Sequence, residues 1–397
     1  MVNAPAVGLL DGLREISHIG RDHRRGGFSR HLWQSAEMEL REWFASRAAR
    51  IGLDVETDRN GNLWAWWGPA GPDAVVIGSH LDSVPGGGEF DGPLGVESAF
   101  AAVARLKAAG VRPRRPLAVI AFAEEEGSRF GVACLGSQLL TGSISPDYVR
   151  ALRDEDGISF AEAGAHVGFD TRGIGRDDEA LSRIALFIEL HVEQGRGLVD
   201  LGSPTAIASR ILAHGRWTLT FRGQGNHAGA TLMADRDDPM VTAARAVLDV
   251  RETALEFPGS RATVGRLTAV PGGANVIASS VVMTLDARAS SDEETRALVA
   301  AIAARVGASE FVENSWSPEV HFDAGLAATV AAAVGDVPVL PSGAGHDAGI
   351  LAGAVPTAMI FVRNPDGVSH APGEYAELAD CLAGIDALER VVGSLVQ

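Results

Sequence analysis

Three short apolar segments of this chain each lead into a side chain that can bind a metal ion. The segments are Ala74–Ile77, Leu117–Ala123 and Ile184–Leu190, and they lead into His80, Glu126 and His191. Short runs rich in β-branched residues are typical of buried strands. A helical pattern over residues 94–109 separates the first two runs, which predicts a mainly parallel sheet covered on both faces. Because such strands end at one edge, we expect the three side chains to lie there together.

The segment from Gly78 to Val96 adds a second candidate ligand to the first strand. Three consecutive glycines at positions 86–88 precede Asp91. Glycines allow the backbone to fold back, so that Asp91 can approach His80. An imidazole and a carboxylate on one loop suit a divalent metal ion. A glycine-rich surface turn with ordinary solvated acids would produce a similar pattern.

Three adjacent carboxylates, Glu124, Glu125 and Glu126, follow the second strand. They repel one another unless a positive group is near. A helix N-terminus, an arginine such as Arg129 or a metal ion could supply that charge.

The pattern changes at about Ile211. Residues 217–323 predict the order strand, helix, strand, strand, helix, strand, which is the ferredoxin-like split arrangement. The last 70 or so residues return to the earlier pattern. We therefore expect a discontinuous domain of residues 1–210 and 326–397, interrupted by an inserted domain of residues 211–325.

Composition excludes several classes of partner. The net charge of −17 disfavours nucleic acid and anionic membranes, because neither would be attracted electrostatically. Two cysteines, Cys134 and Cys381, leave no disulfide framework and favour a reducing compartment. The first residues lack the features of a signal peptide, and no run of about 18 apolar residues occurs. These features together predict a cytoplasmic protein.

Several ordered motifs then point to one family. GSHLDSV, FDGPLGV, EEEGSRFG, ELHVEQG, NHAGA and GVSHAPGE resemble the hydantoinase/carbamoylase branch of the M20 metallopeptidase-like amidohydrolases. Within this branch, segments such as EFDGPLGVESAF and NLWAWW look most like bacterial allantoate amidohydrolases. The resemblance implies an α/β fold: a zinc-peptidase-like catalytic domain with a mainly parallel mixed sheet, and an inserted ferredoxin-like α+β lid and dimerisation domain.

The resemblance also implies two divalent metal ions per subunit, zinc or manganese, with cobalt or nickel possible. By motif, His80 and His191 would hold one ion, Glu126 and His370 the other, and Asp91 would bridge them. Such a site can hold two ions about 3.5 to 4 Å apart with a water between them. Glu125, immediately before the ligand Glu126, matches the general base of the family.

Further residues match positions that the family uses around its substrate. His227 resembles the lid histidine that stabilises the oxyanion, and Asn275 and Arg288 resemble lid residues that hold a substrate carboxylate. Gln194 and Arg236 are candidate substrate-side residues, and His346 and Asp347 are candidate supports of the metal site. The lid motifs differ from the common pattern at residues 227–233 and 275–278, which leaves the choice of substrate open.

The resemblance therefore implies a homodimeric amidohydrolase, in which lid residues complete the partner's site, acting on the ureido (N-carbamoyl) C–N bond of a small carboxylic acid. Ammonia and carbon dioxide would be released. Allantoate is the first expected substrate. An N-carbamoyl-L-amino acid hydrolase or a β-ureidopropionase is the alternative, followed by a dipeptidase or an N-acyl aminoacylase. A non-catalytic carboxylate-binding protein would be expected to lose the base or a ligand.

Overall fold

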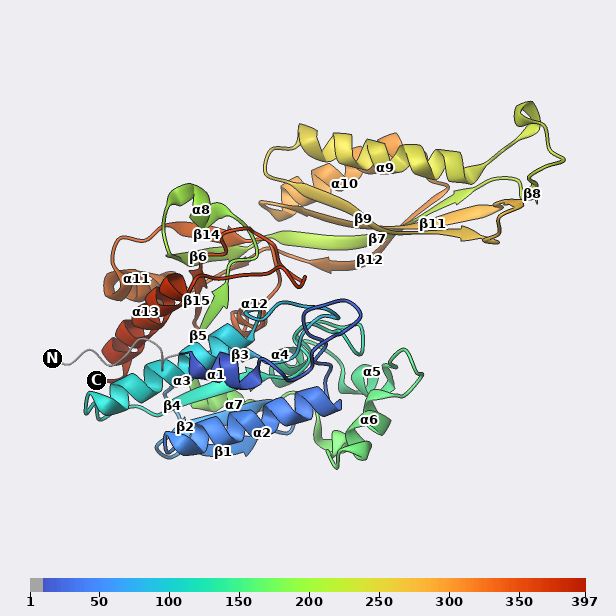
Figure 1. Cartoon of the computed structure of the whole chain (residues 1–397). Coiled ribbons are helices and arrows are strands. Elements are labelled where there is room, and N and C mark those ends of the chain that lie inside the picture. The colour runs from blue at the N-terminus through green and yellow to red at the C-terminus, as the bar shows by residue number, and fades with distance from the viewer. Residues whose placement is uncertain (1–9) are drawn as a thin grey trace. The chain divides into compact units, whose positions relative to one another are not determined.

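The chain folds into two compact units, which the computed structural model describes over residues 10–397 (Figure 1). One unit joins the residues up to Ser209 to His321–Gln397, and the other is Arg210–Val320. The sequence predicts borders at 210/211 and 325/326, and the two compact units meet at 209/210 and 320/321. The larger unit is therefore discontinuous, and the smaller one is inserted into it.

The larger unit is built on a nine-stranded mixed sheet. Its strands are β1 (Asp54–Thr57), β2 (Leu63–Trp67), β3 (Ala74–His80), β4 (Leu117–Phe122), β5 (Ile184–Val192), β6 (Thr205–Ile211), β13 (Val320–His321), β14 (Val339–Ser342) and β15 (Thr357–Val362). The order is β1-β2-β4-β3-β5-β15-β6-β13, with β14 paired to β6. The four central strands β4, β3, β5 and β15 are parallel, whereas β2 and β6 flank them antiparallel. The predicted α/β class with a mainly parallel mixed sheet is confirmed.

Helices cover this sheet because its central strands are apolar on both faces. The helices are α1 (Asp11–Ile16), α2 (Ser35–Arg50), α3 (Pro93–Ala108), α4 (Leu135–Thr141), α5 (Pro146–Ala151), α6 (Phe160–His166), α7 (Asp178–Arg183), α8 (Gly197–Leu201), α11 (Ala324–Val334), α12 (Asp347–Leu351) and α13 (Leu378–Val396). Every residue of β3 is buried. Helices α3 and α13 pack on each other, and both contact β3. Alternate residues Val75 and Ile77 belong to the core cluster that these helices share with the sheet.

Close packing at one glycine places α3 against the ends of the strands. A Cβ on Gly95, in the first turn of α3, would lie 2.2 Å from the Leu190 carbonyl oxygen of β5. Glycine allows the helix and the strand to approach at this point. The loop between β3 and α3 therefore stays next to the carboxyl ends of β3 and β5.

The inserted unit has the ferredoxin-like topology. Its main elements are β7 (Ala213–Arg222), α9 (Pro239–Glu256), β9 (Arg261–Val270), β11 (Ser280–Ala289), α10 (Asp292–Val306) and β12 (Glu310–Ser317). The antiparallel sheet has the order β12-β7-β11-β9, and α9 and α10 pack together on one of its faces (Figure 1). Strands β8 (Asn226–His227) and β10 (Val276–Ile277) form a separate ribbon. The predicted α+β insertion is confirmed.

Candidate active site

Five predicted ligands converge beside the carboxyl ends of the central strands. His80 is the last residue of β3 and His191 lies near the end of β5, while Glu126 follows β4. Asp91 comes from the loop before α3, and His370 from the loop before α13. Strand ends and two loops thus bring together side chains that are up to 290 residues apart in the chain.

The Asp91 carboxylate faces both halves of this cluster. Its Oδ1 atom lies 3.1 Å from His191 Nε2 and 3.6 Å from His80 Nε2. Its Oδ2 atom lies 3.4 Å from His370 Nε2, which in turn is 3.3 Å from Glu126 Oε2. Each oxygen of Asp91 therefore faces one pair of predicted ligands, as a bridging carboxylate does.

The two buried histidines direct their Nε2 atoms at Asp91. His80 Nδ1 lies 3.0 Å from the Asp82 carbonyl oxygen, and His191 Nδ1 lies 2.8 Å from that of Val192. Because a carbonyl oxygen only accepts, each Nδ1 carries a proton, and in the neutral form of each ring Nε2 keeps the lone pair that a metal ion would bind. Within residues 10–397, the buried His80 Nε2 has no hydrogen-bond partner.

These donors fit a pair of divalent metal ions. One group of potential ligand atoms comes from His80, Asp91 and His191, and a second comes from Asp91, Glu126 and His370. Within each group, the ligand atoms lie within 4.8 Å of one another. Imidazole nitrogens and carboxylate oxygens suit zinc, manganese, cobalt and nickel. The two groups share Asp91, so the arrangement suits two adjacent ions.

The charges of the cluster hold protons among these groups. Burial lowers the pKa of His80, but the carboxylates of Glu125, Asp82 and Asp91 outweigh it and raise the pKa well above its usual value. Burial likewise opposes the effect of Asp91 on His191, whose pKa is raised overall. Burial raises the pKa of Glu126 well above its usual range. Cations bound here would replace those protons.

Glu125, the predicted general base, lies beside the cluster. Its side chain is largely buried, with 7% of the residue surface exposed, and its Oε2 atom is 3.8 Å from His80 Nε2. Burial raises the pKa of Glu125 well above its usual value. A carboxyl group with a raised pKa can both accept and return a proton near neutral pH.

Two supporting carboxylates were missed by the sequence reasoning. Asp82 accepts hydrogen bonds from the backbone amides of Glu125 and Glu126, each at 3.1 Å. Glu374 accepts from the amide of Asp91 at 2.9 Å. The available signal was proximity, since Asp82 follows His80 by two residues and Glu374 follows His370 by four.

The remaining predicted residues of the larger unit also adjoin the cluster. Gln194 Nε2 donates to Asp91 Oδ2 at 2.8 Å and lies 3.2 Å from His370 Nε2. The ring of His346 packs edge-on against His191, with 4.5 Å between centroids. Buried Asp347 accepts a 2.5 Å hydrogen bond from Ser137. Gln194 therefore contacts the Asp91 carboxylate, and His346 packs behind His191.

A third group of possible ligands is formed by Glu189, His191 and His346. In this group, both carboxylate oxygens of Glu189 already accept hydrogen bonds from the protein. Glu189 Oε1 accepts from the Ser79 hydroxyl at 2.7 Å, and Oε2 accepts from the Ala348 amide at 3.0 Å. Glu189 thus ties β3 to the start of α12 and supports the fold.

In the inserted unit, His227 and Asn275 lie on neighbouring segments. His227 pairs with Val276 across β8 and β10, and the Ala228 amide donates to the Asn275 carbonyl at 3.0 Å. His227 Nδ1 accepts from the amides of Gly229 and Ala230 at 3.0 and 3.2 Å. The ring proton therefore sits on Nε2, on an exposed side chain, where it can be donated.

The two predicted arginines have partners within the inserted unit. Arg288 donates to both oxygens of Asp286, from Nε at 2.7 Å and from Nη2 at 3.0 Å. Arg236 donates from Nη2 to the Ala228 carbonyl at 2.6 Å and also contacts the Thr231 carbonyl. Arg236 thus secures the loop that follows His227, and Asp286 orients Arg288.

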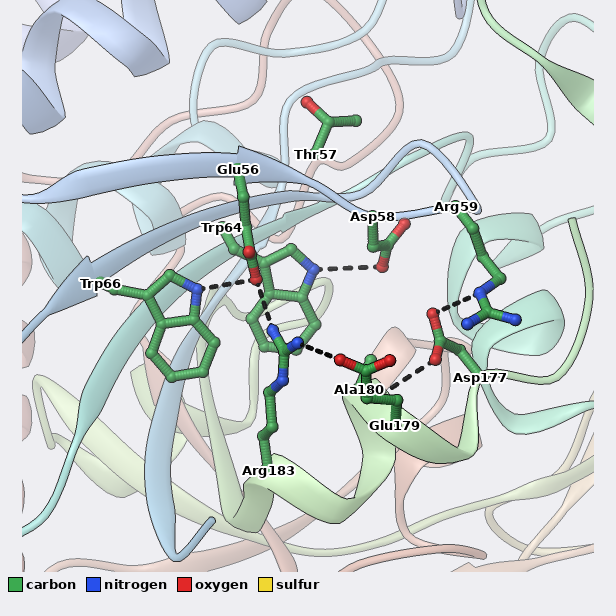
Figure 2. Close-up of a pocket in the computed structure, with 10 residues that line it drawn as sticks. All are labelled: Glu56, Thr57, Asp58, Arg59, Trp64, Trp66, Asp177, Glu179, Ala180 and Arg183. Carbon is green, nitrogen blue, oxygen red and sulfur yellow. Dashed lines mark hydrogen bonds and ion pairs between the residues drawn. The ribbon is translucent and has the colours of Figure 1, made fainter. Parts of the chain in front are cut away.

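A surface pocket elsewhere in the larger unit contains none of the predicted site residues. It lies between the β1–β2 hairpin and α7 and is lined by Glu56, Thr57, Asp58, Arg59, Trp64, Trp66, Asp177, Glu179, Ala180 and Arg183 (Figure 2). Arg183 bonds both Glu56 and Glu179, and the indole nitrogens of Trp66 and Trp64 donate to Glu56 and Asp58. These polar groups hydrogen-bond to one another. We therefore interpret the pocket as a structural contact between the β1–β2 hairpin and α7.

Two groups of potential metal ligands share one carboxylate at the carboxyl edge of the parallel sheet. Together with a ferredoxin-like insertion, this arrangement is typical of metal-dependent hydrolases. Residues 76–394 match the model of peptidase family M20/M25/M40. The chain is 36% identical over 403 residues to an N-carbamoyl-L-amino acid amidohydrolase of Geobacillus stearothermophilus, covering 98% of each protein. It is 33% identical over 379 residues to an allantoate amidohydrolase of Bacillus subtilis, covering 91% of each.

A solved structure agrees with these sequence matches. A hydantoinase/carbamoylase family amidase from Burkholderia vietnamiensis superposes with a TM-score of 0.86 and 32% identity, over 98% of this chain and 97% of that one. The protein therefore belongs to the M20/M25/M40 family, and the predicted resemblance is confirmed. Among residues 10–397, no helix combines the length and the apolar character needed to cross a membrane.

Proposed function

We propose that this protein is a binuclear metal-dependent amidohydrolase that cleaves the ureido C–N bond of a small carboxylic acid, with release of ammonia and carbon dioxide. The observation that carries the proposal is the position of Asp91, whose two oxygens each face a separate pair of His or Glu ligands. The larger unit would be the catalytic domain and Arg210–Val320 the lid and dimerisation domain.

Two bound divalent ions would lower the pKa of a water and polarise the ureido carbonyl. His80 and His191 would hold one ion, and Glu126 and His370 the other. The ligand types accept zinc or manganese, and also cobalt or nickel.

Glu125 would take a proton from the attacking water and deliver it to the departing nitrogen. Its Oε2 atom faces the cluster, and its burial favours the protonated form that must donate. The oxygen of water joins the carbonyl carbon, the C–N bond breaks, and the departing nitrogen receives the proton that Glu125 took from the water. The carbamate that remains then breaks down to ammonia and carbon dioxide.

The lid residues would bind the rest of the substrate. The exposed Nε2–H of His227 can donate to the oxyanion that forms as the carbonyl is attacked. Arg288 and Asn275 would hold the substrate carboxylate, with the Arg288 guanidinium kept in place by Asp286. Gln194, at the bridging carboxylate, would contact the ureido group.

Allantoate is the first proposed substrate, and an N-carbamoyl-L-amino acid is the second. Both the B. subtilis and the G. stearothermophilus relatives carry matching activities in their names, at similar identity. A β-ureido acid, a dipeptide and an N-acyl amino acid rank lower, because neither of these relatives is named for them.

We further propose a homodimer formed through the inserted unit. Helix α9 carries an exposed apolar stripe, Val241, Leu248 and Leu255, whose members are seven residues apart and so lie on one helix face. Strand β9 is an edge strand of its sheet and exposes Leu267 and Val270. A second copy of the chain would cover both features, and its lid residues would complete the partner's site.

The dimer can be tested by light scattering after gel filtration. Leu248→Glu with Leu255→Glu should shift the mass from a dimer to a monomer. Leu201→Glu, which alters an exposed leucine of the larger unit, serves as the matched control. A monomeric wild type would contradict the proposal.

The activity is tested by ammonia release from manganese- or zinc-loaded protein. Allantoate and a panel of N-carbamoyl-L-amino acids should release ammonia, and N-acetyl amino acids should not be hydrolysed. Fast release from allantoate alone would select allantoate, and a preference for N-carbamoyl-amino acids would select the alternative. Hydrolysis confined to N-acetyl amino acids or dipeptides would contradict a ureido substrate.

A further inference from the structure

The thiol of Cys134 contacts the proposed general base. Cys134 Sγ lies 3.4 Å from Glu125 Oε1, and the thiol is buried, as is nearly all of Glu125. The other carboxylate oxygen, Oε2, is the one that faces His80. The S–H group can donate to Oε1, because an unprotonated carboxylate oxygen only accepts. The two oxygens of Glu125 therefore have different surroundings.

The backbone around Cys134 is fixed against the segment that carries Glu125. The amides of Cys134, Leu135 and Gly136 donate to the carbonyls of Glu125, Glu124 and Ala123 at 2.6, 3.0 and 2.8 Å. Three successive hydrogen bonds thus align the start of α4 with the segment that follows β4. They hold the Cβ of Cys134 at a set distance from the Glu125 side chain.

Cys134 also adopts a backbone conformation that is unfavourable for its residue type. Its φ of 52° and ψ of 38° lie in the left-handed region, which glycine or asparagine usually occupies. Residues held in this region tend to occur at functional sites, where the surrounding structure maintains the strain. A cysteine here is consistent with a requirement for its side chain.

The second cysteine provides a contrast. Cys381 is equally buried, but it lies in α13, within the core that α13 shares with α3 and the sheet. It has no part in the cluster around Asp91. Cys381 can therefore report what the loss of a buried thiol does to stability alone.

We propose that Cys134 is a positioning residue for Glu125. Its S–H group holds Oε1, so that Oε2 stays directed at the ligand cluster where the attacking water must lose its proton. This inference rests on the proposed role of Glu125 as the base. No proton is transferred through sulfur, and the thiol stays reduced throughout.

Cys134→Ser and Cys134→Ala test this role as a matched pair. Both variants keep a Cβ in the same strained conformation and remove the sulfur, but only serine keeps a donor. Since a single hydrogen bond contributes modestly, Cys134→Ala should lower kcat about fivefold. We expect KM to stay within about twofold, and Cys134→Ser to restore kcat to within about twofold of the wild type.

Equal losses of kcat in the serine and alanine variants would indicate a packing role and overturn the proposal, as would an unchanged kcat in Cys134→Ala. Cys381→Ala is the control and should leave kcat unchanged, with any effect confined to thermal stability. Metal content is measured for each variant, so that loss of ions is not read as loss of positioning.

Crystal structures of the same variants test the positioning without an activity assay. Glu125 should keep one side-chain conformation in the wild type and in Cys134→Ser, and should leave that conformation or occupy several in Cys134→Ala. An unmoved, single conformation in Cys134→Ala would overturn the proposal. If the metal-loaded wild type hydrolyses no ureido acid, the proposed function fails, and the crystallographic comparison still decides whether Cys134 positions Glu125.

Discussion

The carboxylate of Glu374 accepts a hydrogen bond from the backbone amide of Asp91 at 2.9 Å, across 283 residues of sequence. The same oxygen accepts from the Phe90 amide at 3.2 Å, and the other oxygen accepts from the Ser369 hydroxyl. Glu374 therefore ties the loop that carries Asp91 to the loop that carries His370. Its contacts hold in place the two loops that supply Asp91 and His370 to the proposed metal site.

Removing these acceptors should weaken metal binding. In Glu374→Ala the amides of Phe90 and Asp91 lose their partner, so we expect metal affinity to fall about 10- to 100-fold, the usual effect of removing a group that orients ligands. Glu374→Gln keeps an acceptor oxygen and should be affected less. Titration calorimetry measures both, with exposed Glu377→Ala as the control. Wild-type affinity in Glu374→Ala would show that Asp91 needs no such support.

Replacement of the proposed base should separate catalysis from metal binding. Glu125→Gln preserves the shape of the side chain but cannot take up a proton. We expect both ions to remain bound and kcat to fall by about two to four powers of ten. Metal analysis of the purified variant and steady-state ammonia release provide the two measurements. Normal turnover by this variant would remove Glu125 from the role of base.

Metal binding should depend on pH. The pKa values of His80 and His191 are raised, so in the metal-free protein both imidazoles stay protonated above the ordinary value of about 6.5. A cation must displace these protons, so affinity should rise as pH rises through this range. A group with a raised pKa stabilises the metal-free fold at low pH, and that contribution is lost as pH rises through the folded-state pKa.

Calorimetry in two buffers of different ionisation enthalpy measures the protons released on metal binding. We expect release near pH 7 that declines as the pH is raised further. Binding without proton release would mean that the histidines are already neutral.

The role of Arg288 can be tested through the Michaelis constant. Arg288→Ala should raise KM at least tenfold with a smaller change in kcat, because a charge-assisted bidentate contact to the substrate carboxylate is lost. Arg288→Lys should recover little, since an ammonium group lacks the planar fork. Arg216→Ala is the matched control, because Arg216 also lies near Asp286, at 3.5 Å, but is more exposed. A wild-type KM in Arg288→Ala would rule out the contact.

Much of the fold follows from local sequence patterns. The strands that lead into His80, Glu126 and His191 are apolar on both faces, and the order of elements in the insertion is regular enough to predict its topology. The close approach of Asp91 to His80 was also predicted from the loop glycines. The structure adds Gly92, where a Cβ would come within 2.4 Å of the His80 ring.

The supporting contacts could not be predicted in the same way. Asp82, Glu374 and Cys134 act on backbone amides or on one carboxylate oxygen, and each contact depends on segments that meet only in the folded chain. The partners of Arg236 and Arg288, the Ala228 carbonyl and the Asp286 carboxylate, lie nearby in sequence. No sequence pattern distinguishes such a partner from a group that contacts only solvent.

The central claim is that Asp91 bridges two metal ions. The most direct measurement is anomalous diffraction from crystals soaked in manganese or zinc. We predict two peaks per subunit, one between His80 and His191 and one between Glu126 and His370, on either side of the Asp91 carboxylate. A single peak, or peaks away from Asp91, would contradict the account.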